Sequence, residues 1–99
     1  MLEGMGTALM TDLYEVTMLD AAIRSGVASR RATFEVFARR LPSGRGYGVV
    51  AGPGRLAELL AQFQFSDHQI QYLAGLGRFS EELLEHLQMF RFEGAVWSY

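Results

Sequence analysis

The sequence predicts an α+β fold with an N-terminal helix, a β-hairpin, three short helices and a terminal strand. Three observations support this prediction. Apolar residues recur every three or four positions in four stretches, which is typical of helices that bury one face. Apolar and polar residues alternate along residues 32–40, which is typical of a half-covered strand. Clusters of glycine and proline separate these stretches and indicate turns.

The first helix is predicted over residues 9–25 and carries two apolar faces. One stripe has spacings of three, three and four and consists of Leu13, Val16, Leu19 and Ile23. A second face, well round the helix, consists of Tyr14, Met18 and Ala21. Thr11 or Asp12 can cap the first turn, and Gly26 suits the left-handed position after the last turn. We expect both faces to be covered, one by the core of this chain and the other by a later domain or a partner subunit.

The hairpin is predicted over residues 32–51. Its first strand, residues 32–40, alternates Phe34, Val36 and Ala38 with polar side chains, whereas Phe37 breaks the alternation and suggests partial cover on both faces. Residues 41–45 contain proline and glycine and form the predicted five-residue turn, and residues 46–51 return. The glycine-rich stretch 44–48 lacks the lysine and hydroxyl residue of a phosphate loop, so alone it indicates a flexible tip.

Three further helices and a strand are predicted after the hairpin. Pro53 suits the first position of a helix whose apolar face is Leu56, Leu59, Leu60 and Phe63. Ser66 and Gln69 match a capping box and open a helix, ended by Gly75 and Gly77, whose inward residues are Ile70, Leu73 and Leu76. Ser80 opens the last helix, residues 80–90, whose buried side is Leu83, Leu84, Leu87 and Phe90.

The two ends of the sequence also carry predictions. Residues 1–8 are expected to be a flexible lead-in. Residues 92–99 read as a strand that contains Trp97 and Tyr99, and the sequence stops inside it. Because exposed apolar edge strands invite association, we expect a truncated chain more than a natural terminus.

Composition restricts the function classes. The 99 residues have a net charge of −2, with nine arginines and no lysine, which gives no reason to expect binding to nucleic acid or to an anionic membrane. There is no cysteine, no apolar run of membrane-spanning length and no signal peptide, so a cytoplasmic location is the default expectation. His68 and His86 lie on different predicted helices, so no metal site is predicted.

Four residues are candidates for binding, each with a structural alternative. Tyr14 combines a flat ring with a polar tip, and suits either ligand stacking or an interface. Asp12 can contribute to a site or simply cap the helix. Arg39 and Arg40, together with Arg45, flank the hairpin tip, where guanidinium groups beside exposed backbone N–H groups can cradle a phosphate. Their alternative is a solvated strand end.

Several segments, in this order and spacing, resemble the start of nicotinate phosphoribosyltransferase. They are residues 11–18 (TDLYEVTM), 34–42 (FEVFARRLP) and 46–52 (GYGVVAG), followed by 79–84 (FSEELL) and 90–94 (FRFEG). The resemblance extends from Ala8 to Tyr99. It implies that residues 9–99 are an incomplete N-terminal domain of a type II phosphoribosyltransferase, whose catalytic barrel would lie beyond Tyr99.

The resemblance also implies an activity. Nicotinate and phosphoribosyl pyrophosphate would give nicotinate mononucleotide and pyrophosphate, coupled to ATP hydrolysis with Mg²⁺, in a homodimer with shared active sites. By resemblance, Tyr14 would reach the partner's site and stack on the pyridine, Asp12 would help to position that site, and Arg39 or Arg40 would contact phosphate. No catalytic residue falls within the 99 residues, which alone should be inactive. The competing hypothesis is a stand-alone, non-catalytic binding module that pairs with a separately encoded barrel.

Overall fold

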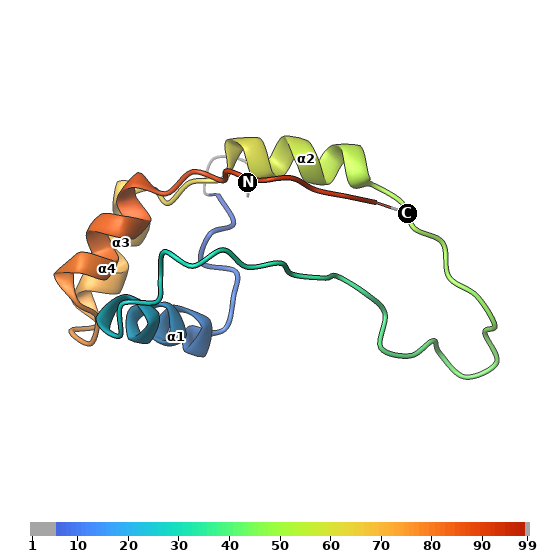
Figure 1. Ribbon diagram of the computed structural model, residues 1–99, viewed down its shortest axis with the longest axis horizontal. Helices are drawn as coiled ribbons and strands as arrows, with labels where there is room; N and C mark the ends of the chain where they lie inside the picture. Colours follow the sequence, from blue (N-terminus) through green and yellow to red (C-terminus); the bar gives the residue numbers. More distant parts are fainter. Residues whose placement is uncertain (1–5, 99) are drawn as a thin grey trace.

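A computed structural model describes residues 6–98 and contains four helices in that range. They are α1 (Leu13–Arg24), α2 (Pro53–Gln62), α3 (Asp67–Gly75) and α4 (Glu81–Met89) (Figure 1). Helix α4 packs against both α1 and α3, whereas α2 contacts none of the other helices. The predicted lead-in lies mostly outside the described residues. Within them, Ala8 is buried and Leu9 packs against the core.

The core is small and is centred on α4. Leu83 and Leu87 of α4, Leu73 of α3 and Val16 of α1 are its buried members. Seven half-buried side chains surround them, namely Leu9, Leu19, Ile23, Phe65, Ile70, Phe79 and Leu84. The predicted inward face of α4 is therefore confirmed at its two central leucines. The predicted stripe of α1 is confirmed as core-facing at Val16, Leu19 and Ile23, whereas its first member, Leu13, is exposed before the core begins.

The helix ends follow local signals in the sequence. In the capping box before α3, the Ser66 N–H donates to Gln69 Oε1 at 2.8 Å and the Gln69 N–H donates to Ser66 Oγ at 3.1 Å. Helix α1 ends in a Schellman motif, in which the Val27 N–H donates to the Ala22 carbonyl at 3.0 Å. Gly26 has φ of 78°, a left-handed conformation that glycine adopts without steric cost. Both predictions are confirmed.

A buried carboxylate joins α1 to α4. Asp20 is only 5% exposed, and its two oxygens accept hydrogen bonds from the hydroxyl and the backbone N–H of Ser80. The Ser80 hydroxyl also accepts from the Leu83 N–H at 3.2 Å, which caps α4. Arg24 pairs with Asp20 at 3.2 Å. One side chain of α1 therefore holds the first turn of α4.

The α+β prediction is wrong, because no described residue belongs to a strand. The turn itself is present: the Arg45 N–H donates to the Pro42 carbonyl at 3.1 Å, and Gly44 has φ of 81°. However, the chain enters and leaves this turn along diverging paths (Figure 1). An isolated hairpin is at best marginally stable without a further layer to cover it. Here the bundle of α1, α3 and α4 covers neither of the two segments that flank the turn. Phe34 and Val36 are 89% and 100% exposed.

Three other expectations also fail. The described part of the predicted terminal strand, residues 92–98, pairs with no other segment, and Trp97 is exposed. The apolar face of α2 is also largely open, because Leu56 and Leu59 are exposed. Leu76, predicted to point inward, is exposed where it follows the last turn of α3. Each of these segments carries apolar side chains for which this chain supplies no second layer.

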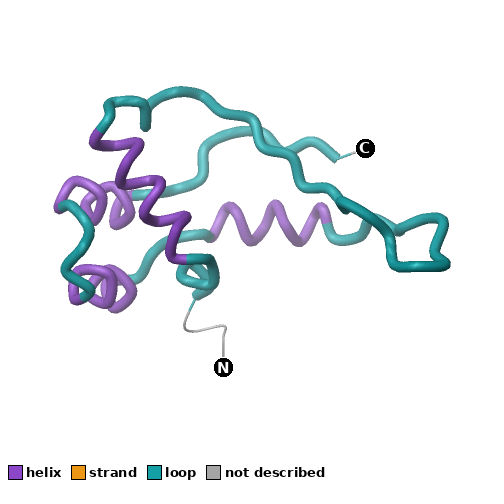
Figure 2. The backbone as a smooth tube through the Cα atoms, turned by 90° about the horizontal axis from the view of Figure 1, so that it is seen from below, coloured by secondary structure: helices purple, strands orange, loops and turns teal. Residues whose placement is uncertain are grey.

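Residues 28–52 form a long extended segment, which we call the arm. It leaves the bundle after α1, runs outward and returns to the start of α2 (Figures 1 and 2). The radius of gyration is 16.3 Å, whereas a compact chain of this length has about 13 Å. The accessible surface is 8991 Å², against roughly 5,700 Å² for a compact monomer of this mass. Much apolar surface therefore remains open.

This open surface predicts the solution behaviour of the 99-residue chain. We expect oligomers and strong binding of a hydrophobic fluorescent dye, because exposed apolar side chains lie along the arm, α2 and residues 92–98. Light scattering after size-exclusion chromatography and a dye titration measure both properties. A monodisperse monomer that melts cooperatively and binds no dye would contradict the expectation.

The Asp20 contact predicts a pH dependence of stability. The hydrogen bond from Ser80 is the main cause that lowers the pKa of Asp20 from 3.8, and the Arg24 charge adds to it, against the opposing effect of burial. A lowered folded-state pKa stabilises the fold above about pH 4, and this contribution is lost as the pH falls through the lowered pKa. In the 99-residue chain, Asp20→Asn should therefore lose less stability than wild type between pH 7 and pH 3.

Urea unfolding followed by far-ultraviolet circular dichroism measures this difference. Glu85→Gln removes an exposed carboxylate from α4 and serves as the control. It should keep the wild-type pH dependence. An Asp20→Asn chain with the same pH dependence as wild type would contradict the assignment.

Candidate functional site

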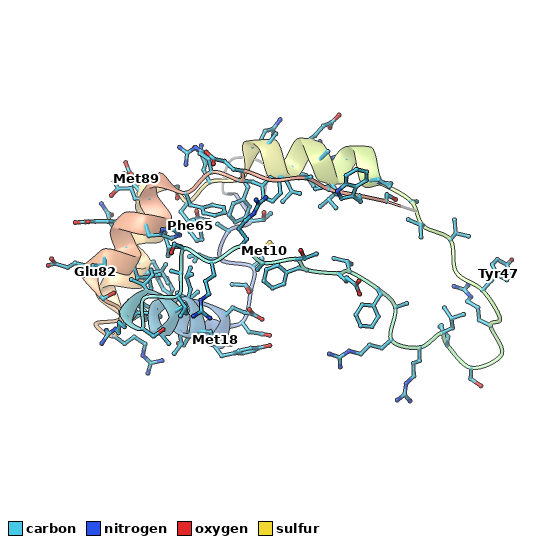
Figure 3. All side chains as sticks on the ribbon, viewed as in Figure 1. Met10, Met18, Tyr47, Phe65, Glu82 and Met89 are labelled. Carbon is cyan, nitrogen blue, oxygen red and sulfur yellow. The ribbon has the colours of Figure 1, made fainter. Side chains whose placement is uncertain are left out.

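Tyr14 lies on the open side of α1. It is the second residue of the helix, and it is 57% exposed. Met10, just before the helix, and Met18, one turn further along it, are also exposed (Figure 3). We call the exposed side of α1 that carries Tyr14, Met18 and Ala21 the outer face of α1. The sequence predicted this second apolar face, and no described residue of the chain buries it.

The environment of Tyr14 keeps its phenol neutral. A hydrogen bond with the Glu15 carboxylate is the main cause that raises the pKa of Tyr14, and the charges of Glu15 and Asp12 add to it. The phenol therefore keeps its proton and its donor function at physiological pH. Glu15, predicted as a helix-surface residue, is exposed beside Tyr14, and more than half of the tyrosine is accessible.

Asp12 occupies the N-cap position, but its side chain makes no capping hydrogen bond. Its backbone carbonyl accepts from the Glu15 N–H at 3.0 Å. The capping prediction therefore holds for the position and fails for the side chain. The carboxylate lies beside a shallow hollow lined by Leu9, Met10, Thr11 and Asp12. A negative charge here is favourable, because it lies at the positive end of the α1 dipole.

Arg39 and Arg40 lie on the arm and are exposed. The turn that follows them is fixed by the Pro42–Arg45 hydrogen bond, and residues 44–49 line a hollow at its tip. Tyr47 marks the far end of the arm in Figure 3. The arm also concentrates positive charge, since it holds five of the nine arginines and only one of the eleven acids. Its net charge is +4, and the rest of the chain carries −6.

The structure does not bring the predicted site residues together. Tyr14 and Asp12 share the N-terminal end of α1, whereas the segment with Arg39 and Arg40 lies out along the arm (Figures 1 and 2). Two separate elements therefore carry the ring and the cations. Whether either arginine contacts phosphate stays a prediction.

Sequence reasoning missed the contact between Asp20 and Ser80. A signal for it was present, because Asp20 follows Val16 by four residues and precedes Ile23 by three. An acid at that spacing interrupts the inward stripe of α1, and a buried carboxylate needs hydrogen-bond donors. Its donor was the N-cap residue of another helix, 60 residues away, which spacing alone does not reveal.

Residues 6–98 show neither a metal centre nor a membrane-spanning helix. No group of three or more histidine, aspartate or glutamate side chains in that range could hold a metal ion. No helix there is long and apolar enough to cross a membrane.

Comparison with known proteins identifies the family. The family model for the nicotinate phosphoribosyltransferase (NAPRTase) N-terminal domain matches residues 9–99. The chain belongs to this family. It is 53% identical over 91 residues to nicotinate phosphoribosyltransferase pncB1 of Mycobacterium tuberculosis, covering 92% of this chain and 20% of that protein.

More distant relatives carry the same name. The nicotinate phosphoribosyltransferase of Bacillus subtilis is 42% identical over 66 residues, which cover 67% of this chain and 14% of that protein. The human enzyme is 38% identical over 68 residues, which cover 69% and 13% respectively. The chain thus spans about a fifth or less of the length of these relatives. No solved structure matches it.

Proposed function

We propose that this chain is the part of a nicotinate phosphoribosyltransferase that supplies an aromatic ring to the pyridine substrate. The complete enzyme would join nicotinate to phosphoribosyl pyrophosphate and release pyrophosphate, in the salvage of nicotinate for NAD. The observation that supports this role is the exposure of Tyr14 on the outer face of α1, within a chain of this family.

The transfer of a phosphoribosyl group to a pyridine requires an aromatic surface, which Tyr14 on the outer face of α1 can supply. A pyridine nitrogen attacks the anomeric carbon of the sugar as pyrophosphate leaves. A flat ring held against the pyridine orients that nitrogen, and excluding water protects the developing cation. The Tyr14 phenol is neutral at physiological pH, so the ring itself adds no charge beside the nicotinate carboxylate when it stacks.

The arm suits the other substrate. Phosphoribosyl pyrophosphate carries several negative charges, and the arm has a net charge of +4. Guanidinium groups bind phosphate oxygens in a forked geometry, which Arg39 or Arg40 would supply once the arm is covered by the rest of the enzyme. Because the arm and the outer face of α1 lie apart, we propose that they serve different parts of a site completed by other segments.

A homodimer with shared active sites in the cytoplasm completes the proposal. In it, Tyr14 enters the site of the partner subunit, which would cover the outer face of α1. The resemblance also implies Mg²⁺ and ATP. Residues 6–98 offer no acidic or histidine cluster for the metal and no phosphate loop for the nucleotide. We therefore assign none of these residues a role in binding Mg²⁺ or ATP.

Tyr14 provides the direct test. In the full-length protein from the same locus, Tyr14→Ala should raise the KM for nicotinate about five- to thirtyfold, the loss typical of removing an aromatic stacking partner. Tyr14→Phe is the matched control and should keep most of the activity, because it keeps the ring. Formation of nicotinate mononucleotide at varied nicotinate is the measurement. A fully active Tyr14→Ala enzyme would exclude stacking.

A mixing experiment tests the shared site within the same proposal. One subunit carries Tyr14→Ala, and the other is inactivated in its barrel. If Tyr14 acts in the partner's site, a heterodimer has one site with both lesions and one with neither, so up to half of the activity per heterodimer returns. The assay uses nicotinate well below the wild-type KM, where Tyr14→Ala alone has little activity. A verified heterodimer that gains no activity over the Tyr14→Ala enzyme would show that Tyr14 acts within its own subunit.

The arginines make a separate prediction. Arg39→Ala or Arg40→Ala in the full-length enzyme should raise the KM for phosphoribosyl pyrophosphate about ten- to hundredfold, since a charged hydrogen bond to phosphate is lost. Lysine at the same position should restore only part, because an ammonium cannot reproduce the fork. Arg55→Ala, on α2, is the control. Unchanged kinetics in both arm variants would leave these arginines as solvated side chains.

A further inference from the structure

The contact between Asp20 and Ser80 is directional, unlike the rest of the packing of α1. Val16, Leu19 and Ile23 hold α1 against the bundle through apolar contacts, which select its buried face but are not directional and so tolerate small rotations. The Asp20 carboxylate, by contrast, accepts two hydrogen bonds from one residue, at 2.5 Å from the Ser80 hydroxyl and 3.3 Å from its N–H. Hydrogen bonds weaken steeply when misaligned. This pair therefore fixes both the rotation of α1 and its height along α4.

The rotation of α1 determines where the ring of Tyr14 points. Tyr14 lies six residues before Asp20, which places it about 120° round the helix and about 9 Å along the axis. A side-chain tip lies about 5–6 Å from the axis, so a rotation of about 20° would carry the ring about 2 Å sideways. A misplacement of about 1 Å can cost about a hundredfold in rate.

We propose that Asp20 and Ser80 are positioning residues that set the orientation of the Tyr14 ring for its substrate. The proposal rests on the function proposed above. Neither residue touches the substrate, because Asp20 is buried against α4 and faces away from the outer face of α1. Ser80 connects this contact to the fold, since its hydroxyl also accepts the Leu83 N–H in the first turn of α4. The orientation of α1 is thereby tied to the most buried helix of the bundle.

The test uses the full-length enzyme with Asp20→Asn and Ser80→Ala. Each variant should raise the KM for nicotinate about tenfold and leave the KM for phosphoribosyl pyrophosphate within about twofold. Ser80→Thr keeps the hydroxyl and should restore the wild-type KM. Glu85→Gln, an exposed charge change on α4, should have no effect. If Asp20→Asn does not fold, the comparison of Ser80→Ala with Ser80→Thr carries the test.

A double substitution separates positioning from general stabilisation. In a Tyr14→Ala background, Asp20→Asn or Ser80→Ala should raise the KM for nicotinate no further, because their effect passes through the ring. A further rise, or a loss of kcat with both KM values unchanged, would overturn the proposal. If Tyr14→Ala raises the KM and the positioning variants do not, only this inference fails. If Tyr14→Ala itself has no effect, the proposed role of Tyr14 fails, and this inference with it.

Discussion

The burial of Leu83 and Leu87 is the constraint on which the described structure depends. These two side chains fill the centre of a three-helix cluster, and within residues 6–98 α4 is the only helix that contacts two others. A core of four buried residues can cover one face of each of three short helices. It has no remaining surface for the arm, for α2 or for residues 92–98, which therefore stay open.

This limited core explains why the candidate site faces outward. Helix α1 packs its inward stripe against the core through Val16. Tyr14 and Met18, on the other side of the helix, therefore lie at the surface. Because Asp20 binds the start of α4, the division between the two faces is fixed by a polar contact as well as by apolar packing. The exposure of Tyr14 is thus a consequence of how α1 is anchored.

The sequence predicted the features that depend on neighbouring residues. The capping box at Ser66, the left-handed Gly26 and the proline that begins α2 all act within one turn of a helix, so their local pattern was sufficient. The hairpin was predicted from the same kind of pattern and did not form. A strand is stabilised by a paired edge and a covered face, and alternation along residues 32–40 reports neither. Of the site, the sequence predicted the open face of α1 and missed its attachment through Asp20.

The arm shows why a wrong secondary structure can accompany a correct family. The arm has the alternation of a strand that is covered on one face. Its Phe34 and Val36 are exposed, which is typical of side chains that pack against another protein layer. The relatives are roughly five times as long as this chain. The segregation of charge agrees with this view. An arm of +4 attached to a remainder of −6 would be drawn back onto an acidic bundle if attraction alone decided its position. It instead extends outward, and its arginines are exposed.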